Sequence, residues 1–204
     1  MNSRTMKYVP HRHWTPRYLI DRVREGRYRH NFPDLPWLTP ASIDILTTWL
    51  RPTDVAVEFG SGKSTAWFAN RVKTLTSVEH NPEWYGRVRP TVEPLGVDYR
   101  LCTDAVSYIA VAQALAPASV DFVLVDGQHR AECVLAVIDA IRPGGLLVLD
   151  NANRYLPSPG TRSPYQLSHH ALPWEDVVQR LGAWRTIWTT NGITDTALFI
   201  KALG

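Results

Sequence analysis

The stretch Val55-Ala56-Val57-Glu58-Phe59-Gly60-Ser61-Gly62-Lys63-Ser64-Thr65 decides the fold of this chain. Its apolar run, Val55–Phe59, is typical of a buried strand. The run ends at Gly60-Ser61-Gly62, and a helical pattern follows over Thr65–Val72. Glycines at such a turn let the backbone approach a ligand closely, and the amino end of a helix attracts negative charge. The stretch therefore predicts a strand, a ligand-binding turn and a helix in succession.

The same alternation continues toward the C-terminus. Strand patterns that alternate with helical ones are typical of βαβ units and a buried parallel sheet. The last two strand patterns are joined through Asn191-Gly192, a pair that favours a hairpin. The fold class is therefore α/β, a mostly parallel sheet that finishes with an antiparallel hairpin. The predicted strands are Leu75–Val78, Val97–Leu101, Val120–Val125, Leu146–Leu149, Ala183–Thr190 and Asp195–Ile200, and the predicted helices are Pro82–Val88, Ala105–Leu115, Ala131–Ile141 and Trp174–Leu181.

Residues 1–52 differ from the rest and are expected to form an N-terminal helical extension or lid on a domain of residues 53–204. A helical pattern begins at Pro16 and ends near Gly26. Thr39-Pro40 is typical of a helix start, because Thr caps the helix and Pro suits its first position. We expect that helix over Ala41–Leu50.

Composition sets the broad class. The chain has 204 residues, of which 45% are apolar and 20% charged, which is close to the globular average and excludes a disordered or fibrous protein. No apolar stretch is long enough to span a membrane, and the first residues do not resemble a secretory signal. The cysteines, Cys102 and Cys133, do not form a CxxC pair. We therefore expect reduced thiols and a cytoplasmic location.

Charge is concentrated at the N-terminus. Residues 1–30 carry a net charge of +6, and the remainder carries −3. A basic arm is compatible with nucleic-acid binding. The arm has no Lys/Arg run and no nucleic-acid motif accompanies it, which favours a solvated amphipathic helix that covers a neighbour or the active site.

Three ligand classes use a glycine turn of this kind. Gly62-Lys63-Ser64 resembles the end of a P-loop, but the required earlier glycine is replaced by Val57. A dinucleotide site requires a third glycine where this chain has Thr65. Glu58, directly before the glycines, would repel a pyrophosphate and attract an ammonium group. It therefore favours S-adenosylmethionine, whose tail is a zwitterionic amino acid.

The chain resembles the class I S-adenosylmethionine-dependent methyltransferases from about Thr53 to Lys201. Five motifs occur in the order of that family, and the resemblance implies a seven-stranded sheet whose final hairpin is reversed. The motifs are Glu58-Phe59-Gly60-Ser61-Gly62, Ser77-Val78-Glu79-His80, Thr103-Asp104-Ala105, Val125-Asp126-Gly127 and Arg142-Pro143-Gly144-Gly145.

The resemblance also implies roles in binding the cofactor. Glu79 would accept both ribose hydroxyls, although a surface acid at a strand end remains the alternative. Asp104 would accept from the adenine amino group, and the backbone of Ala105 would donate to the ring. The whole expected cofactor set is Glu58, Gly60, Ser61, Gly62, Ser64, Thr65, Glu79, His80, Asp104, Ala105 and Asp126. In that set, Gly60 and Gly62 would pass under the methionine part, and Ser64 and Thr65 would lie near its carboxylate.

The acceptor site is expected at the ends of the fourth and fifth strands, where Asp126, Asp150 and Asn151 lie. Catechol-type O-methyltransferases have a similar trio, which implies Mg²⁺ held by three oxygen ligands. That family has a catalytic Lys three residues after the first Asp, and this chain has His129 there. Imidazole acts as a general base near neutral pH, so His129 and Asp126 are the catalytic candidates. Alternatively, these residues only form turns.

Other residues near the predicted acceptor site are open to two interpretations. Arg130 either contacts an anionic acceptor or points to solvent. The Pro-rich loop is either a substrate lid or a mobile surface segment. Its lid candidates are Arg154, Tyr155, Arg162, His169 and His170.

The sequence thus predicts an S-adenosylmethionine-dependent enzyme that O-methylates a small molecule. A homodimer through the aromatic N-terminal segment is expected. A P-loop-like nucleotide enzyme and an RNA-methylating or nucleic-acid-binding protein are the alternatives.

Overall fold

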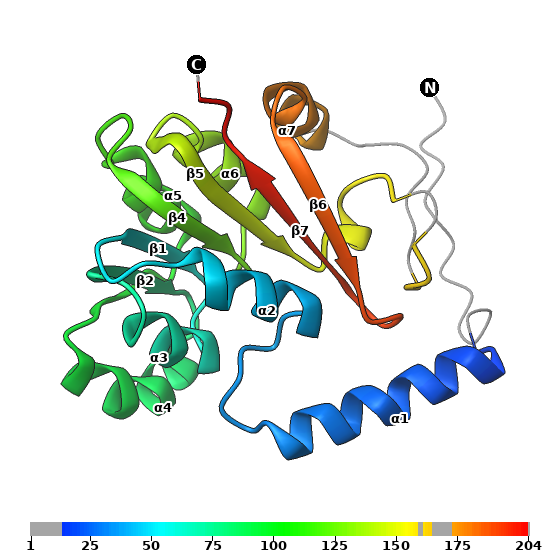
Figure 1. Ribbon diagram of the computed structural model, residues 1–204. Helices are drawn as coiled ribbons and strands as arrows, with labels where there is room; N and C mark the ends of the chain where they lie inside the picture. The colour runs from blue at the N-terminus through cyan, green and yellow to red at the C-terminus, as the bar shows by residue number, and fades with distance from the viewer. Residues whose placement is uncertain (1–13, 159–160, 165–172, 204) are drawn as a thin grey trace.

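The computed structural model describes residues 14–158, 161–164 and 173–203, and it contains one seven-stranded sheet with helices on both faces (Figure 1). The strand order is β3-β2-β1-β4-β5-β7-β6. All neighbouring strands are parallel except β7, which is antiparallel to both β5 and β6. The predicted α/β class and the reversed C-terminal hairpin are confirmed. The strands are β1 Val55–Phe59, β2 Thr74–Glu79, β3 Asp98–Leu101, β4 Val120–Val125, β5 Ile141–Asp150, β6 Arg185–Thr190 and β7 Asp195–Ile200.

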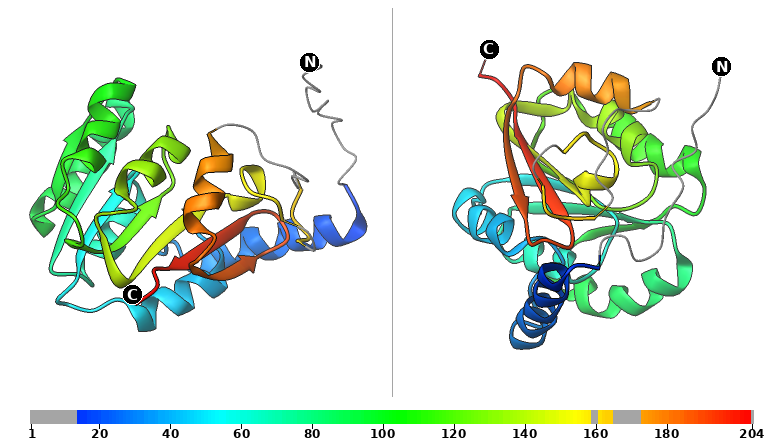
Figure 2. Two further views of the ribbon diagram at one scale, coloured as in Figure 1. Left: turned by 90° about the horizontal axis from the view of Figure 1, so that it is seen from above. Right: turned by 90° about the vertical axis from the view of Figure 1, so that its right-hand side faces the viewer.

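The helices form two layers, one on each face of the sheet (Figure 2). On one face Tyr108, Val134 and Val177 bring α5, α6 and α7 into a core with β1, β4 and β5. On the other face Leu46 and Phe68 pack α2 and α3 against the same strands. The helices are α1 Pro16–Asn31, α2 Pro40–Trp49, α3 Lys63–Ala69, α4 Pro82–Val92, α5 Ala105–Gln113, α6 Arg130–Val137 and α7 Trp174–Leu181, with short 3-10 turns at Glu93–Leu95 and Ala152–Arg154.

The two largest differences from the predicted element ends, five residues each, are at α1 and β5. Helix α1 continues past Gly26 to Asn31, and an ion pair of 2.5 Å between Arg29 and Glu25 supports its last turns. Strand β5 begins at Ile141 rather than Leu146. The backbone around Gly144 and Gly145 bonds to Lys201 after β7, and this pairing accompanies the longer strand. Pairing between distant segments is not visible in a local pattern.

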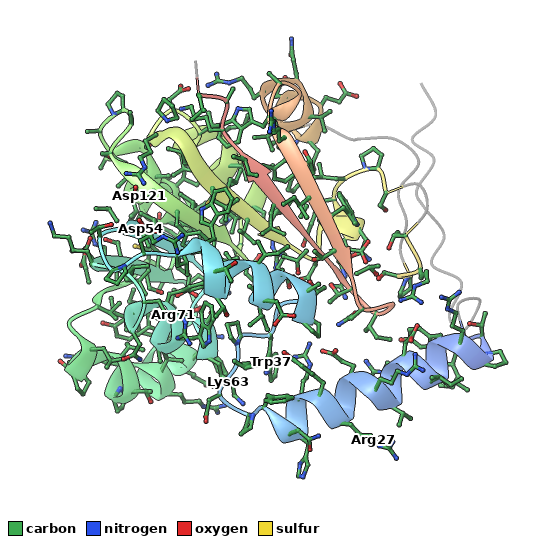
Figure 3. All side chains as sticks on the ribbon, in the orientation of Figure 1. Arg27, Trp37, Asp54, Lys63, Arg71 and Asp121 are labelled. Carbon is green, nitrogen blue, oxygen red and sulfur yellow. The ribbon has the colours of Figure 1, made fainter. Side chains whose placement is uncertain are left out.

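Helix α1 lies beside the turn between β6 and β7 (Figure 1). Its buried residues are acidic: Asp21 packs on Gly192, and Glu25 accepts a hydrogen bond of 2.9 Å from Asn191 Nδ2. Its apolar residues instead face solvent, among them Ile20, which is half exposed. Arg27 points away from the body of the molecule (Figure 3).

In the parts of the chain that the structure describes, no helix has the length and apolar character needed to cross a membrane. The two cysteines, Cys102 and Cys133, are both free.

Candidate active site

The carboxyl ends of β1 and β4 meet at two glycines. Gly60 has a left-handed φ of +97°, and a Cβ there would lie 2.5 Å from the backbone nitrogen of Gly127. The strands hold this contact, since the Asp126 amide donates to Phe59 O at 2.8 Å and the Gly60 amide donates to Val78 O at 2.9 Å. A side chain at Gly127 would in turn meet the Tyr108 hydroxyl at 2.1 Å. The turn after β1 is therefore packed directly on the turn after β4, and only glycine fits there.

A cavity of about 360 Å³ opens beside this contact. Ser61, Glu79 and Trp84 line one end of it, and Asp126 and Arg130 line the other. The cavity lies where the carboxyl ends of neighbouring parallel strands meet, which is where open α/β sheets bind their ligands. Its volume is in the usual range for a small-molecule site.

Glu79 ends β2 and is almost fully buried. Its Oε2 accepts from the amide of Ser61 at 3.1 Å and from the Ser61 hydroxyl at 2.9 Å. Its Oε1 accepts from the amides of His80 and Asn81 at 2.9 and 2.8 Å. Neutral donors thus fix the carboxylate at the cavity wall. These four donors occupy the four lone-pair sites of the carboxylate, so a ligand hydroxyl would displace one of them, such as the Ser61 hydroxyl, which also lies 2.6 Å from the Tyr99 hydroxyl.

Glu58 lies one layer deeper and is fully buried. Its Oε2 accepts from the hydroxyls of Thr65 at 2.6 Å and Ser77 at 2.7 Å. Its Oε1 has no hydrogen-bond partner among the described residues. Burial raises the pKa of Glu58 to about 7, even though hydrogen bonds from Ser64, Ser77 and Thr65 lower it. Glu58 is not among the residues that line the cavity, so its expected attraction of the cofactor's ammonium group stays a prediction.

Ser64 and Thr65 face Glu58 rather than the cavity. The Thr65 hydroxyl accepts from the Gly62 amide at 2.9 Å and donates to Glu58, so it closes the first turn of α3. Both side chains are buried. Because their side chains are turned away, Ser64 and Thr65 could contact the cofactor's carboxylate only through the backbone of this turn. That contact stays a prediction.

The predicted adenine residues lie apart from the residues named above. Asp104 is exposed and caps α5, where Oδ1 accepts from the Ser107 amide at 2.9 Å. Ala105 is the first residue of that helix. The expectation that they contact adenine therefore stays a prediction.

Two aromatic residues complete the Glu79 end. Trp84 lines the cavity, and its Nε1 donates to Ser61 O at 2.8 Å. The Tyr99 hydroxyl is 2.6 Å from the Ser61 hydroxyl, and its ring stacks on Tyr85 at 4.4 Å. Sequence reasoning missed Tyr99, because β3 gives no local sign of which side chain reaches Ser61.

At the other end of the cavity a guanidinium occupies the centre of the expected metal trio. Arg130 Nη2 donates to Asp126 Oδ1 at 2.9 Å and is 3.3 Å from Asn151 Oδ1. Arg130 Nη1 donates to the backbone oxygen of Asp150. The three residues do lie together, as expected from their strand ends. The group among them is Arg130, neither a solvent-exposed residue nor a metal ion.

The remaining oxygens of the trio are also engaged. Asp150 is buried, its Oδ1 accepts from Thr196 at 2.6 Å, and its Oδ2 accepts from Asn151 Nδ2 at 2.8 Å. Burial, and to a lesser degree the charge of Asp126, raises the pKa of Asp150 to about 8. Across the described residues no group of three or more His, Cys, Asp or Glu side chains is arranged to hold a metal. Because Asp126 and Asn151 contact Arg130, and the carboxylate of Asp150 accepts from Thr196 and Asn151, the trio does not fit Mg²⁺.

The catalytic candidates are placed differently. Asp126 lines the cavity, whereas His129 is exposed at the amino end of α6 with a left-handed φ of +49°. The His129 ring lies 6.2 Å from the ring of the buried Tyr108, and the His80 ring lies 6.4 Å from it on another side. Tyr108 was missed by sequence reasoning, because its helical position looks like ordinary core.

The Pro-rich segment is described only in part. Tyr155 stacks on Trp174 at 5.0 Å and lies under the guanidinium of Arg130 at 5.1 Å. Arg162 is exposed. His169 and His170 lie outside the described residues, so the lid interpretation of this segment stays a prediction.

Lys63 points away from the glycine turn. Its Nζ donates to Pro33 O at 2.5 Å, in the segment between α1 and α2 (Figure 3). A P-loop lysine has to reach a phosphate chain at the turn itself. The geometry here ties α3 to the N-terminal segment instead.

Comparisons with known proteins agree with this geometry. Residues 57–152 match a family model described as a methyltransferase domain. No curated protein is significantly similar to the chain.

Solved structures share the fold at low identity. A protein from Corynebacterium glutamicum has a TM-score of 0.59 and 18% identity, covering 91% of each chain. The O-methyltransferase TomG from Streptomyces achromogenes, in complex with S-adenosylmethionine, has a TM-score of 0.56 and 17% identity, covering 96% of this chain and 100% of that one. The 1,6-didemethyltoxoflavin-N1-methyltransferase from Burkholderia thailandensis has a TM-score of 0.51 and 17% identity, covering 99% of this chain and 93% of that one.

Proposed function

Since this chain is an S-adenosylmethionine-dependent methyltransferase of class I, we propose that it methylates an oxygen atom of a small molecule at the Asp126 end of the cavity. The observation that carries the proposal is one cavity with Glu79 at one end and Asp126 at the other. One carboxylate is available for the cofactor and the other for the acceptor. The O-methyltransferase TomG, which has the same fold, supports oxygen as the acceptor atom.

The cofactor side of the proposal rests on three features of this chain. Glu79 accepts the ribose hydroxyls while Ser61 and the amides after β2 hold it in place. The free Oε1 of Glu58 attracts the ammonium group from below the turn. The close contact between Gly60 and Gly127 leaves the turn without side chains. The bound cofactor would supply an electrophilic methyl group: the acceptor oxygen would bond to the methyl carbon as the carbon–sulfur bond breaks, with S-adenosylhomocysteine as the leaving group.

On the acceptor side, Asp126 accepts the proton of the acceptor's hydroxyl and His129 passes it on to solvent. Asp126 lies at the cavity wall, within hydrogen-bond reach of a hydroxyl in the cavity. His129 stands just outside, and its imidazole passes the proton to solvent. Catalysis in this arrangement is chiefly positioning plus ionisation of the acceptor.

The first test is titration calorimetry with S-adenosylhomocysteine and, separately, with ATP. We expect micromolar binding of S-adenosylhomocysteine and no binding of ATP. Binding of ATP alone would overturn the proposal in favour of a nucleotide enzyme.

The second test is methyl transfer from labelled cofactor to a panel of small phenols and hydroxy acids, with RNA as a separate arm. Asp126→Asn should lower kcat at least tenfold and His129→Ala less, while the exposed control Asp139→Asn should leave it unchanged. Transfer to RNA alone, with affinity that falls steeply with salt, would show that the basic arm recognises the acceptor.

Two further points belong to the proposal. We infer a cytoplasmic enzyme with reduced thiols, in which residues 1–52 act as a helical extension. We also infer a homodimer formed through the exposed apolar residues of α1, such as Leu19, Ile20 and Val23. Light scattering on the wild type and on a variant with these three residues changed to Ser tests the dimer, since a monomeric wild type would exclude it.

A further inference from the structure

We propose that the guanidinium of Arg130 is a built-in cation at the ends of β4 and β5, and that it takes the place of a divalent metal in this methyltransferase. The proposal starts from a disagreement. Asp126, Asp150 and Asn151 are residue types that hold Mg²⁺ at such strand ends, yet an arginine lies among them.

The guanidinium is bound by side-chain oxygens of Asp126 and Asn151, two of the three expected metal ligands, and by backbone oxygens of both strand ends. Its Nη2 donates to Asp126 twice, to Oδ1 at 2.9 Å and to the backbone oxygen at 2.6 Å. Its Nε donates to Gly127 O at 2.9 Å, and its Nη1 donates to Asp150 O. The side-chain oxygen of Asn151 lies 3.3 Å from Nη2. One flat group therefore satisfies oxygens from both strand ends at once, which suits the fixed fork of arginine.

The surroundings hold Arg130 in this position. Only 11% of its side chain is exposed, and the ring of Tyr155 lies 5.1 Å from its central carbon. A guanidinium stays charged at every relevant pH. It cannot leave the site by losing a proton, as a lysine could.

A divalent ion is excluded for two reasons. The carboxylate of Asp150 is turned toward Thr196 and Asn151, so it is not directed at the centre of the trio. In addition, an ion placed against Asp126 would stand within a few ångströms of a fixed positive charge, at low solvent exposure, where repulsion is strong. The result is that Asp126, at the acceptor end of the cavity, is paired with a cation of the protein itself and requires no metal loading.

Manganese titration tests the proposal directly. Chelator-treated protein saturated with S-adenosylhomocysteine is titrated with Mn²⁺, and free Mn²⁺ is followed by electron paramagnetic resonance. We expect the wild type to bind no Mn²⁺ below about 1 mM at this site. Arg130→Ala removes the cation and should create one Mn²⁺ site at least tenfold tighter, which Arg130→Ala combined with Asp126→Asn should lose again.

Arg130→Lys is the matched control. It keeps a positive charge and loses the fork, so it should gain no Mn²⁺ site. Melting temperature and S-adenosylhomocysteine affinity establish that each variant is folded. The proposal is overturned if the wild type binds one Mn²⁺ that Asp126→Asn abolishes, or if folded Arg130→Ala gains no affinity. Should Arg130→Ala not fold, the wild-type and Arg130→Lys titrations decide.

The activity arm rests on the proposed function and is kept separate. Methyl transfer by the wild type should be the same with chelator as with added Mg²⁺. A failure to find the acceptor would leave the Mn²⁺ result intact, because that titration needs no acceptor.

Discussion

The two ends of the cavity hold their carboxylates in opposite ways. Glu79 is fixed by amide and hydroxyl donors from Ser61, His80 and Asn81, the His80 Nδ1 lies 3.0 Å from its Oε1, and among the described residues no Arg or Lys is paired with it. Asp126 is paired with the guanidinium of Arg130, so its charge is balanced inside the protein. The Glu79 end is built to receive hydroxyl donors from a ligand. The Asp126 end carries its own counter-charge, so it requires less charge compensation from a molecule that binds there.

The largest effect is expected at the glycine contact between the two ends. Gly60→Ala would place a Cβ 2.5 Å from Gly127 N at a left-handed φ, so both overlap and backbone strain oppose folding. We expect a loss of about 2–5 kcal/mol in unfolding free energy, measured by urea denaturation.

Gly62→Ala is the control for that variant, because a Cβ there has only Trp84 within 4 Å, at 3.9 Å, and the backbone is extended. Its change should stay below about 1 kcal/mol. Equal losses of unfolding free energy in the two variants would show that the close contact between Gly60 and Gly127 is not what makes Gly60→Ala destabilising.

Glu79→Gln tests whether the charged end binds the cofactor. The amide would turn an N–H toward donors that now meet a carboxylate, and a charged acceptor for the ribose would be lost. S-adenosylhomocysteine should bind about 10- to 100-fold more weakly by calorimetry.

Asp104→Asn is the matched change at the exposed cap of α5, where Asn caps a helix about as well as Asp. Its effect on affinity measures the predicted adenine contact and should be smaller than that of Glu79→Gln. A larger loss of affinity in Asp104→Asn than in Glu79→Gln would show that the start of α5, and not the end of β2, contributes most to cofactor binding.

The Glu79 end was predictable from sequence because its chemistry is local. Glu79 ends an apolar strand, and Gly60 follows another, so each position is given by a few neighbouring residues. The parallel order of β2, β1 and β4 then brings those strand ends together. The side chain at this end that could not be placed from the sequence is Tyr99, which reaches Ser61 from β3.

The Asp126 end depends on a turn that sequence does not reveal. His129 adopts a left-handed φ of +49°, and Asn151 one of +53°. Histidine does not strongly predict that conformation. The left-handed turn at His129 nevertheless directs Arg130 back over the strand ends. Sequence reasoning therefore found the three oxygen-bearing residues and assigned a metal to the space that Arg130 fills.

Helix α1 shows the same limit. The sequence predicted a solvated amphipathic helix that covers a neighbour or the active site, and it did not indicate that Asp21 and Glu25 are its buried residues. The acidic face of the helix is buried against the β6–β7 turn, where Asn191 donates to Glu25. That turn is far away in sequence.

A moderate, pH-dependent effect is expected beneath the Glu79 end. Burial raises the pKa of Glu58 to about 7 from 4.5, so the folded state prefers the protonated form. Its contribution to stability is complete below pH 4.5 and is lost as the pH rises through 7. Between pH 5.5 and 8.5 the wild type should therefore lose about 2 kcal/mol relative to Glu58→Gln.

The measurement is the difference in unfolding free energy between the two proteins at several pH values. Saturating S-adenosylhomocysteine should reduce the slope, since its ammonium would stabilise the ionised carboxylate beside the free Oε1. An unchanged slope with ligand would mean that Glu58 serves the turn alone and not the cofactor.

The smallest effect is expected at Lys63, which lies at the start of α3 yet belongs to neither end of the cavity. Its ammonium donates to Pro33 O on the exposed surface, so Lys63→Ala removes one contact with the N-terminal segment. S-adenosylhomocysteine affinity should stay within about twofold of the wild type, and stability should change by less than about 0.5 kcal/mol. A lysine that served a phosphate at the turn would give the opposite result, a loss of ligand binding with little effect on the N-terminal segment. In the comparison of the two ends, α3 acts through Thr65, which holds Glu58 beneath the turn, and Lys63→Ala separates that contribution from the charge of the helix's first residue.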